Sequence, residues 1–217
     1  MPTHETIIIG AGPAGSVAAA LLRQQGRKVL IVEREQFPRF SIGESLLPQS
    51  MEYIEAAGLL QDVVEAGFQY KNGAAFVRGE RTTEFDFRNK FSAGWGTTYQ
   101  VQRGDFDHVL AKGAERMGAE VRYRHEVLAV EPGETPQVTV RSPEGEEYVI
   151  EADFLKVRTD DFLCVSISIS AVQPHFLCRP QAKKFAAPCF QPEFHFLIVG
   201  IFLLKSIFAV LKARHIL

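Results

Sequence analysis

Glycines with the spacing of a nucleotide-binding loop lie near the start of the chain. Residues 10–15 read GAGPAG, which fits the pattern G-x-G-x-x-G. Glu33 follows Gly10 by 23 residues. Gly10 allows a tight turn, Gly12 lets the backbone approach a pyrophosphate, and Gly15 lets a helix pack close to a strand. A carboxylate at the position of Glu33 accepts hydrogen bonds from ribose hydroxyls. These residues predict binding of a dinucleotide, and the loop alone does not distinguish FAD from NAD.

The segments around this loop are those that would position it. Residues 7–9 form a β-branched strand, residues 16–26 an Ala/Leu-rich helix that ends on glycine, and residues 28–33 a second buried strand that ends on an acid. A helix N-terminus behind the glycines presents free N–H groups and the positive end of a dipole to an anion. The order of strand, loop, helix, strand and acid predicts a Rossmann-like unit.

Later segments extend this α/β prediction. Residues 37–48 read FPRFSIGESLLP and lead into a helix ending near residue 58, and residues 101–114 read VQRGDFDHVLAKGA and open another helix. Strands are expected at residues 120–123 and 127–130. Residues 137–140 and 147–150 are expected to form a hairpin around residues 143–145. The fold class is therefore a parallel sheet with helices and an antiparallel hairpin.

Three of these segments, GAGPAG, PRFSIGESLLP and VQRGDFDHVLAKGA, resemble the flavin-dependent halogenases, within the wider group of aromatic-hydroxylase-like FAD oxidoreductases. The resemblance covers the N-terminal part of a family member, from residue 5 to about residue 155. It implies FAD as cofactor, an aromatic small-molecule substrate that is halogenated or hydroxylated, and flavin reduced by a separate reductase. Geranylgeranyl-reductase-like flavoproteins share similar segments, so an isoprenoid substrate is the alternative.

The resemblance also implies roles for individual residues. It places the FAD pyrophosphate on the loop, the adenosine ribose on Glu33 with Arg34 beside it, and the adenine on the backbone of Val127. Residues near the isoalloxazine and the phosphates would come from residues 39–45 and from the helix after residue 102. These cofactor-binding candidates are Gly10, Gly12, Pro13, Ala14, Gly15, Glu33, Arg34, Arg39, Gly43, Glu44, Ser45, Arg103 and Val127.

Other side chains carry a weaker signal. Lys71 lies in the region where halogenases place a catalytic lysine, but a solvated hairpin lysine is the interpretation we favour. The alternating phenylalanines of residues 83–92 are typical of a half-buried strand. His4, His108 and His125 lack a partner acid and metal-ligand spacing, so no metal site is predicted.

Composition changes abruptly near residue 155. Residues 1–155 hold 16 of the 17 glycines and carry a formal charge of −7, whereas residues 156–217 hold one glycine and carry +5. The family pattern expects a short Asp-x-x-Gly segment after residue 155, and Trp95 alone cannot supply a halogenase Trp-x-Trp-x-Ile-Pro motif. We therefore expect a partial FAD-binding domain at 1–155 and an atypical tail at 156–217 that is not native family sequence. A non-catalytic fragment is the remaining alternative.

The overall charge of −2 argues against a nucleic-acid partner, which requires a basic face. The N-terminus lacks the charged and apolar regions of a secretion signal, and the three cysteines have no pairing framework, so a cytoplasmic protein is expected. The apolar segment 196–211 is interrupted by Lys205 and falls short of the roughly 20 apolar residues of a membrane span. We therefore do not expect this segment to contact a membrane.

Overall fold

The computed structural model describes residues 4–156 and 166–167. The predictions for the rest of the tail, including the apolar segment 196–211 and the three cysteines, lie outside the described residues. Among the described residues, no helix is long and apolar enough to cross a membrane, and no cluster of acids, histidines and cysteines could hold a metal ion.

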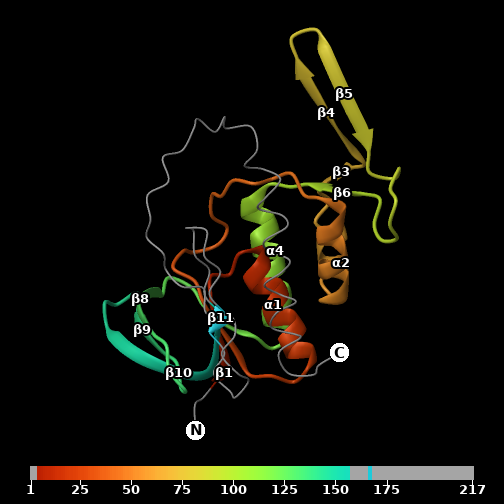
Figure 1. The fold of residues 1–217 in the computed structure, drawn as a ribbon. Coiled ribbons are helices and arrows are strands. Elements are labelled where there is room, and N and C mark those ends of the chain that lie inside the picture. The colour runs from red at the N-terminus through yellow and green to blue at the C-terminus, as the bar shows by residue number, and fades with distance from the viewer. Residues whose placement is uncertain (1–3, 157–165, 168–217) are drawn as a thin grey trace, which may run out of the picture. The chain divides into compact units, whose positions relative to one another are not determined.

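A seven-stranded mixed sheet forms the centre of the described part, with six strands in the order β7-β2-β1-β10-β9-β8 and β11 paired with β10. The parallel strands are β1 (His4–Ile9), β2 (Val29–Val32), β7 (Glu120–Arg122) and β10 (Glu147–Lys156). The antiparallel strands are β8 (Glu126–Glu131), β9 (Gln137–Arg141) and β11 (Ser166–Ile167). This arrangement confirms the predicted α/β class with its parallel sheet and its antiparallel hairpin (Figure 1).

Residues 7–9 of β1 and all of β2 are continuous apolar runs, as expected for parallel strands with both faces covered. On one face, Ile8 and Ile31 pack against alanines of α1 (Pro13–Gln24) and α4 (Arg103–Arg116). On the other face, Ile7 and Leu30 pack against side chains from β9 and β10. The small alanine side chains let the two helices approach the sheet closely.

A second group of elements follows β2. Helices α2 (Pro48–Ala56) and α3 (Leu60–Glu65) precede β3 (Gln69–Lys71), which pairs with β6 (Thr98–Gln100). The single tryptophan, Trp95, donates a hydrogen bond of 2.8 Å from its Nε1 to Glu55 Oε2. This bond ties the segment before β6 to helix α2.

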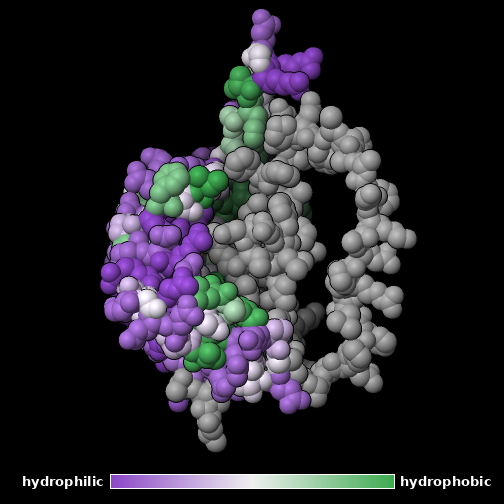
Figure 2. All heavy atoms as spheres, turned by 90° about the vertical axis from the view of Figure 1, so that its left-hand side faces the viewer, coloured by the Kyte–Doolittle hydropathy of each residue, from purple (hydrophilic) through white to green (hydrophobic). Residues whose placement is uncertain are grey.

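The hairpin of β4 (Gly73–Arg78) and β5 (Arg81–Asp86) pairs only with itself in the described part of the chain. Figure 2 shows hydrophobic side chains on this hairpin below a hydrophilic tip. Phe76 and Phe85 stack with ring centroids 5.9 Å apart. Phe85 is 52% exposed and Phe91 is fully exposed. The predicted half-buried strand over residues 83–92 is therefore wrong: β5 ends at Asp86, and its one aromatic side chain, Phe85, is exposed. Phe87, after the strand, is half-buried, with Lys71 Nζ 5.2 Å from its ring centroid.

The histidines also differ from expectation at one position. His4 has a partner acid after all, because its Nε2 lies 2.7 Å from Glu120 Oε2. The pair joins the start of β1 to the start of β7, two strands apart in the sheet and more than a hundred residues apart in the sequence. Sequence proximity could not reveal this contact.

Candidate functional site

The glycine loop turns sharply between β1 and α1. Gly10 has φ +95°, which glycine adopts without strain, and its N–H donates to Val32 O at 2.8 Å. A Cβ on Gly15 would lie 2.0 Å from Gly10 O, so only glycine allows the helix to lie this close to the loop. The predicted tight turn and close packing are both present.

Helix α1 begins in a way that suits an anion. Its N-cap is Gly12 and its first residue is Pro13, so no side chain caps the helix, and the first turn contains no acid. The backbone N–H groups and the positive dipole end of this turn are therefore available to a phosphate. Pro13, Ala14 and Gly15 form this first turn, so the helix begins three residues earlier than the residues 16–26 expected from the sequence. The local geometry fits a pyrophosphate.

Glu33 follows the last residue of β2 and is 4% exposed. Its Oε2 accepts a hydrogen bond from the N–H of Ala11 at 2.8 Å, and its Oε1 accepts one from the N–H of Glu35 at 3.0 Å. Each carboxylate oxygen can accept two hydrogen bonds, so capacity remains for ribose hydroxyls. The neighbouring Arg34 is a surface residue, with a side chain 69% exposed and its Nε 3.6 Å from Glu35 Oε1.

Arg39 and Arg103, both predicted to bind the cofactor, contact the same buried acid, Asp107, to which the sequence analysis assigned no role. The carboxylate of Asp107 on α4 is fully buried and lies 2.7 Å from Arg103 Nε and 3.3 Å from Arg39 Nη2. Arg39 Nε also lies 3.8 Å from Glu33 Oε1. The spacing of Arg103 and Asp107, one helical turn apart, was the available signal, but the same spacing is common in exposed ion pairs.

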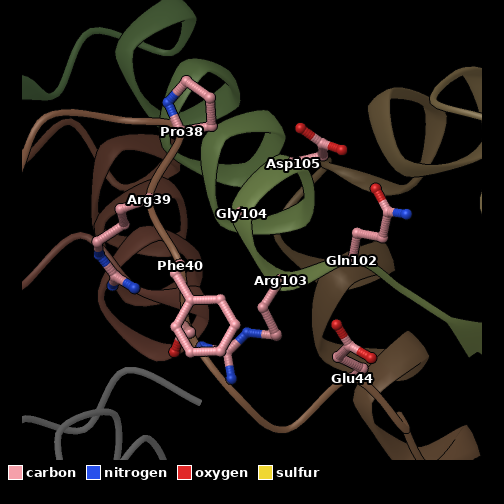
Figure 3. A pocket seen from close by; sticks show the side chains of 9 residues that line it. Pro38, Arg39, Phe40, Glu44, Gln102, Arg103, Gly104 and Asp105 are labelled. Atoms are coloured by element: carbon pink, nitrogen blue, oxygen red, sulfur yellow. The ribbon is translucent and has the colours of Figure 1, made fainter.

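The segment before α2 lies against the first turn of α4, as Figure 3 shows. A Cβ on Gly104 would lie 3.0 Å from Arg39 O, and a Cβ on Gly43, whose φ is +94°, would lie 3.0 Å from Arg103 Nη1. Arg103 Nη1 also donates to Ile42 O. Glycines at 43 and 104 therefore permit the close approach of the two segments.

A pocket of about 360 Å³ opens between these segments. Arg39 and Arg103 line it together with two acids, Glu44 and Asp105. The backbone of Glu44 is held in place because its C=O accepts a hydrogen bond of 2.8 Å from the N–H of Val101. The remaining lining residues are Pro38, Phe40, Ser41, Gln102 and Gly104.

Lys71 differs from the solvated hairpin lysine that we favoured. It lies on β3 rather than in the β4–β5 hairpin, and its Nζ donates to Ser45 Oγ and to Leu46 O, the latter at 3.2 Å. Partial burial lowers the pKa of Lys71. The lysine therefore contacts the same segment that carries Gly43 and Glu44.

Val127 lies farther along the chain, on strand β8, at a shift in the register between β8 and β9. Its side chain is half-buried and packs against the face of the sheet that carries Ile7 and Leu30. Arg39, Glu44 and Arg103, by contrast, line one pocket.

Comparison with known families decides the classification. A family model described as FAD binding domain matches residues 3–156. The chain belongs to this family. FAD is accordingly its cofactor, and the uncapped α1 turn and the buried Glu33 fit that molecule.

Relatives with curated descriptions include a flavin-dependent halogenase of Armillaria mellea, 32% identical over 71% of this chain and 32% of its own length. A tryptophan 2-halogenase of Chondromyces crocatus is 35% identical over 69% of this chain and 28% of its own length. The chain thus spans about a third of the length of these relatives.

Solved structures give the same picture. A flavoprotein/dehydrogenase from Cytophaga hutchinsonii is 47% identical, with a TM-score of 0.68 over 70% of this chain and 38% of its own. The myxobacterial chondrochloren halogenase CndH is 36% identical, with a TM-score of 0.67 over 74% of this chain and 38% of its own. The anhydrotetracycline hydroxylase OxyS from Streptomyces rimosus is 27% identical, with a TM-score of 0.59 over 71% of this chain and 31% of its own.

Proposed function

We propose that this chain provides the FAD-binding part of an oxidoreductase of the halogenase or monooxygenase type. The observation that carries the proposal is the uncapped first turn of α1 beside the buried carboxylate of Glu33. The turn offers N–H donors to a pyrophosphate, and the carboxylate offers acceptors to the adjoining ribose. The halogenases and the hydroxylase among the similar proteins support the same assignment.

The individual roles follow the chain through the site. The loop residues, including Gly10 and Gly12, would bind the pyrophosphate, and Glu33 with Arg34 would face the ribose. Arg39 and Arg103 would reach phosphate oxygens, because guanidinium groups suit the geometry of phosphate. The segment carrying Gly43, Glu44 and Ser45 would lie near the isoalloxazine, and the Val127 backbone near the adenine.

Bound FAD would supply the redox chemistry, while the protein supplies binding, orientation and exclusion of water. Lys71 is the one side chain we propose for catalysis. Its hydrogen bond to Ser45 supports this role, because the segment carrying Ser45 would lie near the isoalloxazine. The lowered pKa of Lys71 favours its neutral form relative to an exposed lysine. Its ammonium or amine would donate or accept a proton at Nζ.

Substrate and partners extend the proposal. The substrate would be an aromatic small molecule, free or carried by a protein, as the names of relatives such as a 1H-pyrrole-2-carbonyl-[peptidyl-carrier protein] brominase suggest. A separate flavin reductase would supply reduced flavin in the cytoplasm. Residues 1–155 would form the cofactor domain, and residues 156–217 a distinct tail.

A second candidate is a flavoprotein that reduces or dehydrogenates its substrate. The observation in its favour is the 47% identity to the flavoprotein/dehydrogenase from Cytophaga hutchinsonii. An isoprenoid substrate, as in geranylgeranyl-reductase-like flavoproteins, belongs to this candidate. A chain that binds the nucleotide without turnover is the remaining alternative.

Titration of the full chain with FAD tests the proposal. We expect the protein to bind FAD, with a shift in the visible flavin absorption, and to bind ADP more tightly than adenosine. Absence of FAD binding by folded protein would refute the assignment. FAD-loaded protein is then incubated with reductant, oxygen, bromide and phenols or indoles, and in parallel with isoprenoids under anaerobic conditions. By mass spectrometry, a halogenated or hydroxylated product supports the first candidate, a reduced isoprenoid supports the second, and no product in either reaction supports the chain without turnover.

A further inference from the structure

Asp107 carries a carboxylate that is fully buried yet closely paired. Its Oδ1 lies 2.7 Å from Arg103 Nε, and its Oδ2 lies 3.0 Å from Arg103 Nη2 and 3.3 Å from Arg39 Nη2. Burial of a charge costs free energy unless partners compensate it, and here two guanidinium groups do so. The bidentate contact with Arg103 fixes the plane of that guanidinium.

The same two arginines connect Asp107 to both parts of the site. Arg39 Nε lies 3.8 Å from Glu33 Oε1, at the end of β2. Arg103 Nη1 donates to Ile42 O, in the segment that precedes α2. Asp107 therefore lies at the centre of a chain of contacts that runs from the ribose-binding acid to this segment.

The arginines keep donors free for a ligand. Each guanidinium has five N–H groups, and Asp107 engages only some of them. Both side chains are about one-eighth exposed, at 12% and 13%, and both line the pocket between residues 38–44 and the first turn of α4. The acids Glu44 and Asp105 line the same pocket, so an anion would have to bind at its arginine side.

We propose that Asp107 is a positioning residue that aligns Arg39 and Arg103 so that their free N–H groups bind a phosphate of the dinucleotide. The inference rests on the proposed function and adds a residue to it. Without Asp107, the two cations would repel each other and turn toward solvent. With it, their orientation is set before the ligand arrives, which reduces the ordering cost of binding.

The decisive variant is Asp107→Asn, which keeps the shape of the side chain and removes its charge. In titrations of the full chain, we expect the Kd for FAD and for ADP to rise about tenfold or more, as for a broken buried charge pair. The Kd for adenosine, which has no phosphate, should change much less. A purely structural role would weaken all three ligands alike, so the ratio of ADP to adenosine affinity is the readout.

A mutant cycle tests whether Asp107 acts through its two arginine partners. If it does, adding Asp107→Asn to the double variant Arg39→Gln, Arg103→Gln should leave the Kd for FAD close to that of the double variant, because the arginine changes have already removed both interactions. Asp107→Glu, which retains the charge, should recover part of the affinity. Asp62→Asn is the matched control, since Asp62 on α3 forms a bidentate pair with Arg116 at the end of α4, and the Kd for FAD of this variant should not change.

The outcomes separate the inference from the proposed function. If the unmodified chain binds no FAD, the proposed function fails, and the inference with it. If the unmodified chain binds FAD, and Asp107→Asn binds FAD and ADP as tightly as the unmodified chain does, only the inference fails. If circular dichroism shows that Asp107→Asn does not fold, Arg103→Lys replaces it, since lysine keeps the charge but cannot form the bidentate pair. Unchanged ADP binding by that variant would also overturn the inference.

Discussion

Glu33 Oε2 accepts a hydrogen bond of 2.8 Å from the backbone N–H of Ala11, which joins the end of β2 to the middle of the glycine loop. The acid proposed to bind ribose therefore also holds the loop proposed to bind pyrophosphate. A change at Glu33 should affect both parts of the ligand together.

We expect Glu33→Gln to raise the Kd for FAD about tenfold, since hydrogen bonds to charged groups contribute roughly 1.5–3 kcal/mol. The Glu33 carboxylate accepts hydrogen bonds from the N–H groups of Ala11 and Glu35, and the NH₂ group of the glutamine amide would face one of these two donors. Isothermal titration calorimetry would measure the change. Glu35→Gln is the control, and an equal loss in that variant would mean that net charge, rather than the Glu33 position, determines affinity.

The same carboxylate predicts nucleotide preference. Glu33 should repel a 2′-phosphate on the ribose, so FAD and ADP should bind more tightly than NADPH. Competition of each nucleotide against bound FAD would give the order of affinities. Tighter binding of NADPH than of ADP would contradict the placement of Glu33 at the ribose.

Gly12→Val should abolish FAD affinity while leaving the fold intact. Gly12 has φ −65° and ψ 179°, a conformation open to valine, so the backbone is not strained by the change. The branched side chain would instead occupy the space through which a pyrophosphate approaches. FAD titration together with thermal melting would check both parts, and retained FAD binding would place the ligand elsewhere.

Gly15→Ala, unlike Gly12→Val, should destabilise the fold itself. The new Cβ would lie 2.0 Å from Gly10 O, a backbone atom of the tight turn, so helix and loop must separate. Overpacking of this kind costs about 1–3 kcal/mol or more, which circular dichroism would detect as a lower Tm. Gly133→Ala is the matched control, because its nearest neighbour would be Thr135 O at 3.8 Å. Equal melting of the two variants would count against the close packing.

Glu120 should contribute to the loss of stability in acid. Burial alone would raise its pKa, but hydrogen bonds from His4 and Arg122 outweigh burial and lower the pKa. A carboxyl whose pKa is lower in the folded state stabilises the fold above its unfolded pKa, and that contribution is lost as the pH falls through the folded pKa. Denaturant unfolding between pH 7 and pH 3 should therefore show a shallower pH dependence for Glu120→Gln than for the unmodified chain. Parallel curves would contradict the expectation.

The βαβ unit was predictable because its signals are local. The buried runs of β1 and β2, the glycines between them and the acid at Glu33 all lie within about thirty consecutive residues, the usual length of such a unit. Helix α4 was predictable for the same reason, since its apolar residues repeat with helical spacing.

The parts that sequence could not supply depend on contacts between distant segments. Asp107 and Arg103 have the spacing of an ordinary surface pair, and burial by the segment carrying Arg39 is what sets them apart. Lys71 and Ser45 are 26 residues apart in the sequence, and no pattern in either segment predicts the hydrogen bond between them. The aromatic residues between positions 83 and 92 alternate as in a half-buried strand, but alternation shows neither where β5 ends nor whether another element covers these side chains.

The bond between Trp95 and Glu55 makes the chain its own optical reporter. All indole fluorescence arises from one position, next to α2 and between the aromatic hairpin and β6. Flavin absorbs in the region where indole emits, so a flavin bound nearby would quench that emission without any added label. Loosening of the segment around Trp95 would instead change the emission wavelength, so ligand binding and local unfolding would have separate spectroscopic signatures in one experiment.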